Sequence, residues 1–379
     1  MEIVHLVFNK PDHFNRKLVS AVDQLAAEQA KLGHSVNLWE IGNAPSDNFQ
    51  FRAYHTSLFR VKDFIWSPTD EINEAIKNLK RDTIIHMHGG FIPMFISLAV
   101  QFRKRNIPFI YTSHGTFNKN ILQSSGILRK LYFRFFENIL IKWSAAVHFE
   151  GRNEREQIGE TGLTENKKVF FIPNGLNNGN HLTPPKLRKN TEPVFGYFGK
   201  LEIEEGGLDT LLHAFAEYRF KYFEKGELWI VGEGEGREEL MQLASRLGVQ
   251  DSVLFKGNIL GNRKFELLNK IDVFLRPSRV EYNTASILEA ASSSVPAVVS
   301  KETNMGEYIN EYDAGYEMTE NNANCLAKNM IKCLKDIRQQ RWNYKRRNAY
   351  RMVNEKFQWK TIAKEHIHAY QQVLVEQVA

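Results

Sequence analysis

Short apolar runs alternate with helical patterns along both halves of the chain, and this alternation restricts the possible folds more than any other feature. EIVHLVF is followed by the amphipathic segment LVSAVDQLAAEQAKLG, which Gly33 ends, and then by HSVNLWEI. TIIHMHG, PFIYTSHG, AAVHFE and KVFFIPNG are the later apolar runs of the first half. Strands that alternate with helices predict βαβ units, and therefore a parallel sheet with both faces covered.

Residues 174–193, NGLNNGNHLTPPKLRKNTEP, interrupt this alternation and have the Asn, Pro and Gly content of a linker. VFGYFGKL restarts the pattern, and ELWIVGEGEG, VLFKGNI, DVFLRPSRV and PAVVSK continue it. A chain of 379 residues is long for one core. We therefore predict an α/β protein of two doubly wound, Rossmann-like domains, 1–173 and 194–352, with a cleft between them.

Positive charge is concentrated in one part of the first half. The whole chain carries +6, but eight Lys or Arg and one Glu lie within 103–142. The segment RKLYFRFFENILIKW places cations and large apolar residues on helical spacing. One interpretation is a helix packed by its apolar face, with its cations in water. The other is docking on an anionic membrane surface.

Several protein classes are disfavoured. Two cysteines, Cys325 and Cys333, are too few for a disulfide framework or a zinc cluster. Apolar runs are too short to span a membrane, and MEIVHLVF indicates a first strand rather than a signal peptide. No nucleic-acid-binding motif accompanies the basic segment. We expect a cytoplasmic protein, peripheral on the inner face of the membrane if the basic segment docks there.

The decapeptide EYNTASILEA places Glu281 and Glu289 eight positions apart, directly after a predicted strand. Thr284, Ala285 and Ser286 begin a helix, whose free N–H groups would face the carboxyl edge of the sheet. The two carboxylates would lie on the order of 10 Å apart along that edge. This span suits a sugar at one end and a ribose at the other, with a diphosphate over the start of the helix.

RPSRVEYNTASILEAASSSVPAVVS resembles the E-x7-E segment of the retaining glycosyltransferases of family 4, which have the GT-B fold. Further segments resemble family motifs in the same order along the chain: IPNG, GKLEIEEGGLDTLLHAF, WIVGEGEGREEL, VLFKGNI and FQWKTIAKEHIHAY. The resemblance implies the GT-B architecture. It also implies that 353–379 forms a closing helix that returns to the first domain.

The resemblance implies a role for each matching residue. Glu281 would hold the transferred sugar, Glu289 the ribose and Lys200 the diphosphate, while backbone groups of residues 255–259 would contact the base. The implied donor-binding set is Gly199, Lys200, Gly257, Asn258, Ile259, Arg279, Glu281, Asn283, Thr284, Ala285, Ser286 and Glu289. No Asp-x-Asp occurs in the chain, so we expect no metal and no other cofactor.

Two positions depart from the family pattern. Lys200 replaces an arginine and so lacks the bidentate fork. Gly206 stands where the family has a second cation, the lysine of K-G-L-D. We hypothesise that Arg276 or Arg279 replaces the missing charge.

In the first half, Ser113-His114-Gly115 ends a predicted strand, as the family's His-Gly does, and would direct His114 into the cleft near the sugar or the acceptor. His86 and His88 share one face of a strand, but no third metal ligand suggests itself, so His88 and Gly89 more simply line the cleft. FNKPDHFNRKL has no glycine, unlike the family's first loop, and Arg16 or Lys17 would supply charge there; a surface loop is the alternative.

Together these features predict a retaining, metal-independent glycosyltransferase with catalytic residues His114, Glu281 and Lys200. Its partners would be a nucleotide-diphosphate sugar, UDP favoured over GDP, and a glycan or lipid-linked acceptor of cell-surface polysaccharide synthesis. The alternatives are a non-catalytic nucleotide-sugar or polysaccharide binding protein of the same fold, and a nucleotide-sugar epimerase.

Overall fold

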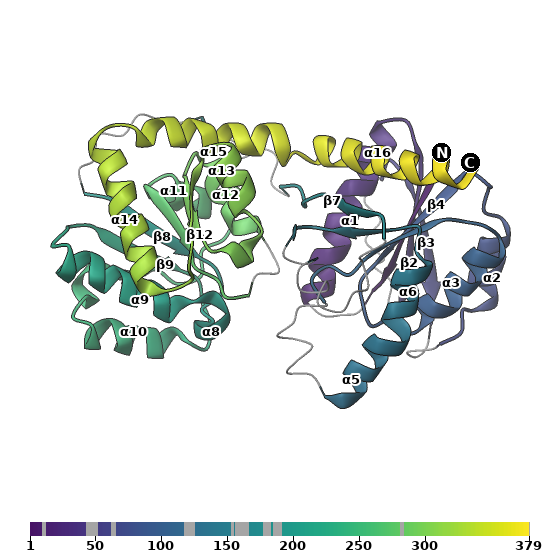
Figure 1. The fold of residues 1–379 in the computed structure, drawn as a ribbon, viewed down its shortest axis with the longest axis horizontal. Coiled ribbons are helices and arrows are strands. Elements are labelled where there is room, and N and C mark those ends of the chain that lie inside the picture. Colours follow the sequence, from purple (N-terminus) through teal and green to yellow (C-terminus); the bar gives the residue numbers. More distant parts are fainter. Residues whose placement is uncertain are drawn as a thin grey trace. The chain divides into compact units, whose positions relative to one another are not determined.

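The computed structural model describes residues 1–9, 13–42, 52–61, 66–116, 126–152, 155, 167–176, 183–184, 192–280 and 284–378. The chain forms two compact units (Figure 1). Unit 1 comprises residues 1–175 and 359–379, and unit 2 comprises residues 176–358. Each unit has a parallel sheet and helices around its own hydrophobic core, as the alternating pattern predicts. The fold is therefore the expected α/β type.

Unit 1 contains a seven-stranded sheet whose spatial order is β3-β2-β1-β4-β5-β6-β7. All neighbouring strands are parallel, and β1 pairs with β2 on one side and β4 on the other. β1 is buried from Ile3 to Phe8, as expected for a central parallel strand covered on both faces. The strands are β1 (Glu2–Phe8), β2 (Ser35–Gly42), β3 (His55–Arg60), β4 (Thr83–His88), β5 (Phe109–Thr112), β6 (Ala146–Phe149) and β7 (Val169–Phe171).

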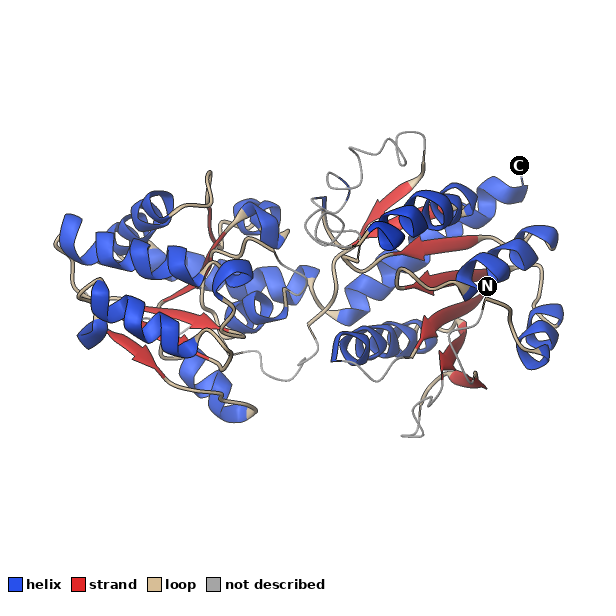
Figure 2. Cartoon of the chain, turned by 90° about the horizontal axis from the view of Figure 1, so that it is seen from below, coloured by secondary structure: helices blue, strands red, loops and turns tan. Residues whose placement is uncertain are grey.

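Helices cover both faces of this sheet (Figure 2). On one face, α1 packs beside α16 and buries Leu18, Val22 and Ala26 against β1 residues such as Ile3. Thr69 caps α2 by accepting a hydrogen bond from the Ile72 N–H. The helices of unit 1 are α1 (His13–Lys31), α2 (Asp70–Lys77), α3 (Met94–Lys104), α5 (Ile127–Tyr132), the π-helical turn η1 (Phe133–Glu137), α6 (Asn138–Trp143) and α16 (Trp359–Val378).

Unit 2 contains a six-stranded parallel sheet of order β10-β9-β8-β11-β12-β13. Its strands are β8 (Val194–Phe198), β9 (Glu227–Val231), β10 (Val253–Phe255), β11 (Val273–Arg276), β12 (Ala297–Val299) and β13 (Gly315–Glu317). The helices are α8 (Ile203–Gly206), α9 (Leu208–Ala216), η2 (Glu217–Lys221), α10 (Arg237–Arg246), η3 (Gln250–Ser252), α11 (Asn262–Leu268), α12 (Ala285–Ser292), η4 (Lys301–Thr303), α13 (Gly306–Glu311), α14 (Ala323–Arg338) and α15 (Trp342–Lys356).

The chain passes between the units at two places. It leaves unit 1 after Gly175, which packs against the Trp359 ring, and it re-enters unit 1 at Trp359. The predicted closing segment 353–379 therefore spans the end of α15 in unit 2 and the whole of α16 in unit 1. Most of the predicted linker lies outside the described residues.

The predicted helix of residues 129–143 is interrupted by the π-helical turn η1. Its second half fits the packed interpretation, because Phe133, Leu140 and Ile141 are buried. Its first half does not, because Leu131 is 44% and Phe135 56% exposed, and the helix begins two residues before the predicted start with the exposed Ile127 and Leu128. The segment thus combines a buried end with an end that presents apolar side chains to solvent. Within the described residues, no helix is long and apolar enough to cross a membrane.

Candidate active site

Both sheets reverse their strand order once, and that position is where ligands bind in open parallel sheets. In unit 1 the reversal lies between β1 and β4, and in unit 2 it lies between β8 and β11. Ligands at such a point meet the carboxyl ends of strands and the loops that follow them. These two edges contain most of the predicted site residues, and they differ sharply in chemistry.

In unit 1, hydrogen-bonded side chains form a line across four strands. Gln29 Oε1 lies 2.7 Å from His5 Nε2, and His5 Nδ1 lies 2.9 Å from His88 Nε2. His88 Nδ1 lies 3.0 Å from His114 Nε2, and His114 Nδ1 lies 2.6 Å from Glu150 Oε1. We call Gln29, His5, His88, His114 and Glu150 the histidine line. It runs from a fully buried amide on α1 to a partly exposed carboxylate after β6.

A second group of hydrogen bonds lies beside this line. His86 Nδ1 is 2.6 Å from the Tyr370 hydroxyl, and His86 Nε2 is 2.7 Å from Thr112 Oγ1. Thr112 Oγ1 also lies 2.9 Å from His148 Nδ1, and His148 Nε2 donates to the Ile172 carbonyl at 2.8 Å. Residues of β4, β5, β6 and α16 are thereby joined through side chains at the same edge.

Burial keeps the fully buried histidines at this edge uncharged. It lowers the pKa of His5 to about 4 and that of His148 to about 4, and it lowers the pKa of His86, His88 and His366 well below the usual value. Burial, the largest single influence, raises the pKa of Glu150, but the interactions with His114, His148 and Asn174 together outweigh it, so the net pKa lies below the usual value. Glu150 is the ionised end of a histidine line whose buried members His5 and His88 are neutral.

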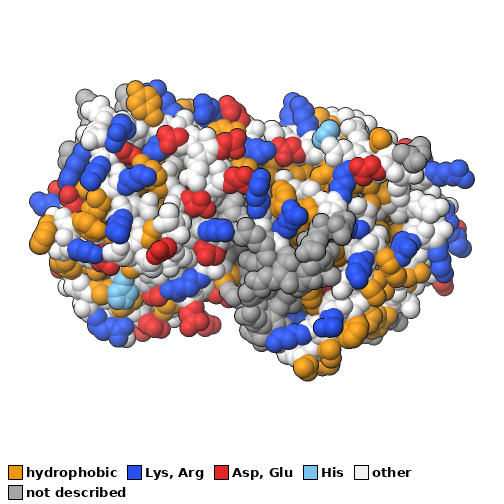
Figure 3. All heavy atoms as spheres, viewed as in Figure 1, with side chains coloured by type: hydrophobic (Ala, Val, Ile, Leu, Met, Phe, Trp, Pro, Cys, Tyr) orange, Lys and Arg blue, Asp and Glu red, His pale blue; other side chains and the backbone are white. Residues whose placement is uncertain are grey.

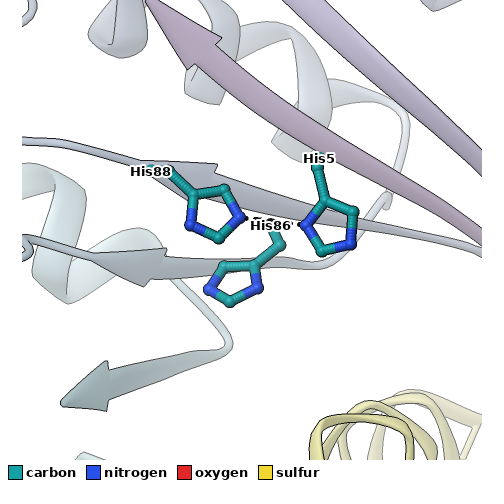
Figure 4. A group of neighbouring side chains, drawn as sticks. All are labelled: His5, His86 and His88. Carbon is teal, nitrogen blue, oxygen red and sulfur yellow. Dashed lines mark hydrogen bonds between the residues drawn. The ribbon is translucent and has the colours of Figure 1, made fainter. Parts of the chain in front are cut away.

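Three of these rings could in principle hold a metal ion. His5, His86 and His88 each offer a nitrogen, and these atoms lie within 4.8 Å of one another (Figure 4). The sequence suggested no third ligand for the pair His86 and His88; the fold supplies His5 from β1. However, every nitrogen of the three rings already has a hydrogen-bond partner, so a metal would have to displace Gln29, Tyr370, Thr112 or a neighbouring ring.

The predicted residues of unit 1 are placed as follows. His114 follows β5 in the left-handed region with φ 51°, a conformation that costs free energy and is held by its surroundings. The sequence interpretation required a free ring nitrogen on His114 for contact with a sugar. Both ring nitrogens instead contact protein groups. Gly89, with φ 105°, donates to the Thr112 carbonyl at 2.8 Å. Arg16 belongs to α1, but its side chain lies outside the described part.

Sequence reasoning missed His5, Gln29 and Glu150. A polar residue inside the apolar run EIVHLVF was a usable signal, because an unpaired buried imidazole is unfavourable and so implies a partner. Nothing in the sequence around Gln29 pointed to His5, because the contact depends on how α1 packs on the sheet.

In unit 2, glycines bring strand ends and loops close together. A Cβ on Gly199 would lie 2.6 Å from Nη1 of Arg276, and one on Gly232 would overlap the Gly199 carbonyl. Gly207, with φ 65°, packs directly against the Pro277 carbonyl. Gly207 and Gly232 admit only glycine, because a Cβ there would overlap backbone carbonyls, so the loops after β8, β9 and β11 form one compact edge.

Three predicted cations occupy different environments at this edge. Lys200 is 69% exposed and forms an ion pair with Glu202. Arg279 donates to Asp209 Oδ2 at 2.7 Å and to Thr210 Oγ1 at 2.9 Å, which ties the loop after β11 to α9. Arg276 lies beside Gly199 and over the Tyr197 ring. Of the two arginines proposed to replace the missing charge, Arg276 is therefore the one beside Gly199, while Arg279 is committed to a carboxylate.

The position of the missing lysine also meets this edge. Gly206 is buried at the end of α8, and a Cβ there would lie 3.2 Å from the Tyr197 hydroxyl. Tyr197 donates to the Lys200 carbonyl at 2.9 Å. A side chain at position 206 would thus begin next to Tyr197, which contacts both Lys200 and Arg276.

Helix α12 begins at this edge, directly after Thr284. Glu289 lies on it, 12% exposed, and forms an ion pair with Lys264 of α11. Ser286 Oγ is buried and has no hydrogen-bond partner within the described residues. Ala285 is the first residue of the helix. Glu281 and Asn283 lie outside the described residues.

The segment predicted to contact a nucleotide base follows β10. Gly257 has φ 69°, and its carbonyl accepts from the Gly232 N–H at 2.9 Å. Asn258 is exposed and Ile259 is partly buried against the core of unit 2. Backbone groups of these residues are therefore fixed beside the glycine loop that follows β9.

Comparison with known proteins gives one family model for each of the two units of the chain. The family model "Glycosyltransferase Family 4" matches residues 18–178, and "Glycosyl transferases group 1" matches residues 181–349. An uncharacterized glycosyltransferase of Methanocaldococcus jannaschii is 28% identical over 230 residues, which are 57% of this chain and 57% of that protein. The alpha-monoglucosyldiacylglycerol synthase of Streptococcus pneumoniae is 21% identical, over 74% of this chain and 67% of the enzyme.

A solved structure extends the likeness to the whole chain. The Anabaena protein HepE in complex with UDP superposes with a TM-score of 0.67 at 18% identity, over 98% of this chain and 100% of HepE. HepE has also been solved with UDP-glucose. At this identity the likeness concerns the fold. The two family models, which together match most of the chain, and the GT-B fold identify this chain as a member of the family 4 glycosyltransferases.

Proposed function

We propose that this glycosyltransferase moves a sugar from a nucleotide-diphosphate donor, with UDP favoured over GDP, to a hydroxyl of a glycan or lipid-linked acceptor, with retention and without a bound metal. One observation carries the proposal: helix α12 starts at the strand reversal of unit 2, beside an edge where glycines bring the loops close together and where Arg276 lies. Helix N-termini and cations at such a point stabilise the charge of phosphates. Support for UDP comes from HepE, which binds it.

The proposed transfer requires mainly that the donor and the acceptor hydroxyl be positioned and that the negative charge of the leaving diphosphate be stabilised. The leaving diphosphate gains negative charge as its bond to the sugar breaks, and the start of α12 with nearby cations would stabilise that charge. Retention would follow if the acceptor hydroxyl approaches on the face that the diphosphate leaves. In our proposal Glu289 binds the ribose. Because Glu289 forms an ion pair with Lys264, it would exchange partners when the ribose binds.

The test is a thermal-shift measurement with UDP, GDP, ADP and pyrophosphate in EDTA. A ligand present at 100 times its dissociation constant adds about 2.7 kcal/mol of stability. We expect one nucleoside diphosphate to raise the midpoint of the wild type and to lose most of this effect in Glu289→Ala. Glu311→Ala is the matched control, since Glu311 ends α13 and so lies toward the opposite edge of the sheet.

The outcomes separate the alternatives. Stabilisation without transfer or donor hydrolysis would support a non-catalytic binding protein, and interconversion of the donor sugar would support an epimerase. Stabilisation that appears only with added Mg²⁺ or Mn²⁺ would contradict the metal-independent mechanism.

We also propose that the exposed side of α5 and η1 docks on an anionic membrane, which would bring the enzyme to a lipid-linked acceptor. Ile127, Leu128, Leu131 and Phe135 are between 44% and 79% exposed. Arg129, Lys130 and Arg134 are exposed among them, and Figure 3 shows apolar and basic side chains together on this part of unit 1. Apolar area combined with positive charge is typical of interfacial helices. The relative from Streptococcus pneumoniae is named for a diacylglycerol product, which favours a lipid acceptor.

Co-sedimentation with vesicles tests this docking. Binding should require anionic lipid and weaken with salt, because each cation near the surface contributes about 1 kcal/mol. Leu128→Ser with Phe135→Ser should abolish it, whereas the exposed pair Phe220→Ser and Phe223→Ser in unit 2 serves as the control. Equal binding to neutral vesicles, or no effect of the first pair, would contradict the proposal.

A further inference from the structure

The loop that joins β4 to α3 contains a strained residue. Phe91 has a φ of 59°, a left-handed conformation that is unfavourable for a bulky side chain. The loop begins directly after His88, and the Gly89 N–H donates to the Thr112 carbonyl at 2.8 Å, so the loop starts at the sheet edge that contains the histidine line. A strained backbone persists only where surrounding groups hold it. Groups that hold Phe91 therefore also restrict the loop beside this edge.

Glu137 holds the Phe91 backbone. It ends the π-helical turn η1, is fully buried, and accepts from the Phe91 N–H at 2.6 Å through Oε1. Its Oε2 accepts from the Tyr111 hydroxyl of β5 at 2.5 Å. Hydrogen bonds to a carboxylate are shorter and about twice as strong as those between neutral groups. One side chain thus ties η1 both to β5 and to the loop after β4.

The ring of Phe91 contacts the same segment. The Arg129 guanidinium lies 4.2 Å from the centre of this ring, a distance at which a cation and an aromatic face attract each other. The Tyr132 ring lies 5.8 Å from it. Arg129 and Tyr132 belong to α5, which runs into η1. Backbone and ring of Phe91 are therefore both held by residues 127–137.

A carboxylate is a costly choice for this position. Within the described residues Glu137 is bonded to neutral donors and forms no ion pair. Burial raises its pKa to about 7, although the bonds from Tyr111 and Phe91 and the charge of Arg129 oppose this rise. Tyr132 is a further titratable group here, and its pKa is raised by burial and by Glu137. A glutamine of the same shape could satisfy Phe91 and Tyr111 without a buried charge. What the carboxylate adds is a stronger bond to Phe91 when it is ionised.

We propose that Glu137 is a positioning residue for the proposed transfer: its ionised carboxylate holds Phe91 in the left-handed conformation and thereby fixes the loop 89–93 beside His88, where the sequence places the acceptor. The role in transfer rests on the proposed function, whereas the hold on the loop does not. Because the residues proposed to bind the donor belong to unit 2, this hold should control turnover and not nucleotide affinity.

The experiment reads the Phe91 amide directly, by proton–nitrogen NMR of protein labelled with ¹⁵N-phenylalanine, between pH 5 and pH 9. The amide is assigned by its absence in Phe91→Leu. In the wild type we expect its proton to move downfield with a midpoint near pH 7, as the carboxylate ionises. Glu137→Gln should keep the amide protected from exchange but abolish the titration. Glu137→Leu should leave the amide unprotected, because its acceptor is lost.

Tyr111→Phe is the matched control. It removes the other donor to the carboxylate and leaves the bond to Phe91 in place. Because the Tyr111 bond lowers the pKa of Glu137, the midpoint read at the Phe91 amide should move to higher pH.

Turnover separates positioning from a merely structural role. At pH 8, Glu137→Leu should lose about ten- to a hundredfold in donor turnover while its affinity for UDP stays within about twofold of wild type. Glu137→Gln should restore most of the turnover. It should also remove the fall in turnover that the wild type shows below pH 7, because the amide holds the loop equally at every pH. A loss of folded protein would instead reduce turnover and UDP-binding capacity together.

Several results would overturn the proposal. One is a Phe91 amide that does not respond to pH in the wild type, or that titrates equally in Glu137→Gln. Another is full turnover in Glu137→Leu at saturating donor. If Glu137→Leu does not fold, the spectra of Glu137→Gln and Tyr111→Phe still decide. Because the spectra need no donor, a wild type without transferase activity would contradict the proposed function and not the hold on the loop.

Discussion

The two strand reversals of this enzyme share a topology but not a chemistry. Between β1 and β4 the edge is filled by imidazole rings, and every nitrogen of His5, His86 and His88 is hydrogen bonded within the protein. Between β8 and β11 the edge is built from glycines, and charged side chains such as Lys200 surround it. The first edge is filled by hydrogen-bonded rings, whereas the second is built from closely packed loops and carries charged side chains.

This difference shows how one fold supports two tasks. A hydrogen-bonded network of buried rings resists rearrangement, because any broken bond leaves an unpaired polar group. Such an edge suits a residue that must be held still, as His114 is. An edge of glycines and exposed ion pairs exchanges partners with little cost, which suits a diphosphate that binds and leaves.

The largest expected effect is a different acid sensitivity of the two units. His5, His86, His88, His148 and His366 are buried with lowered pKa values in unit 1, while unit 2 contains only His181 and His213. Below pH 6.5 the unfolded chain binds protons that the folded unit 1 does not, until the pKa values of the folded state are reached, which are about 4 for His5 and His148. Each histidine then lowers stability by about 1.4 kcal/mol per pH unit.

Pulse proteolysis in urea at pH 7.5 and 5.5, with the surviving fragments identified by mass, measures this difference. We expect the urea midpoint of unit 1 to fall steeply at pH 5.5 and that of unit 2 to change little. Equal shifts in both units would show that the cluster does not control acid sensitivity.

A smaller effect of opposite sign is expected from Glu137 in the same unit. Burial raises its pKa to about 7, although it accepts from the Tyr111 hydroxyl at 2.5 Å and from the Phe91 N–H at 2.6 Å. Between pH 4.5 and 7 the unfolded chain ionises this group while the folded chain does not, so it lowers stability by about 3 kcal/mol as pH rises. Glu137→Gln should therefore gain that amount over wild type between pH 5 and pH 8, by urea unfolding. A difference that does not vary with pH would contradict it.

In unit 2, the two arginines should behave differently. Arg276→Ala should weaken UDP binding by about ten- to a hundredfold, the range for a lost hydrogen bond to a charged group. Arg279→Ala should change affinity by less than about threefold and lower the free energy of unfolding by less than about 1 kcal/mol, because its ion pair with Asp209 is partly exposed. Calorimetric titration with UDP measures both. The reverse ranking would assign the phosphate contact to Arg279.

The smallest expected effect is a gain. Gly206→Lys restores a cation beside Tyr197 and should tighten UDP binding by about fivefold, a modest change because the new Cβ lies only 3.2 Å from the Tyr197 hydroxyl. Gly206→Ala is the control, since it adds the same Cβ without charge. If alanine has the same effect as lysine, charge is not the cause.

Much of the fold could be predicted from local pattern. The apolar runs at 2–8, 83–88, 194–198 and 227–231 became central strands because a parallel strand is buried on both faces and so must be apolar throughout. The helix that follows β11 could also be predicted, because the family resemblance and the helical pattern both place its start at Thr284. The π-helical turn at 133–137 was not, and its last residue, Glu137, accepts a hydrogen bond from Tyr111 on a strand distant in sequence.

The sequence by itself determined the α/β architecture, the family and the segments that reach the two sheet edges, because these depend on residues close together along the chain. Only the tertiary structure decided which side chains meet there. It brought His5, His88 and His114 into one line, assigned Arg279 to Asp209 and placed Arg276 beside Gly199. These contacts join residues far apart in sequence, and strand order and helix packing set them, which no local pattern encodes.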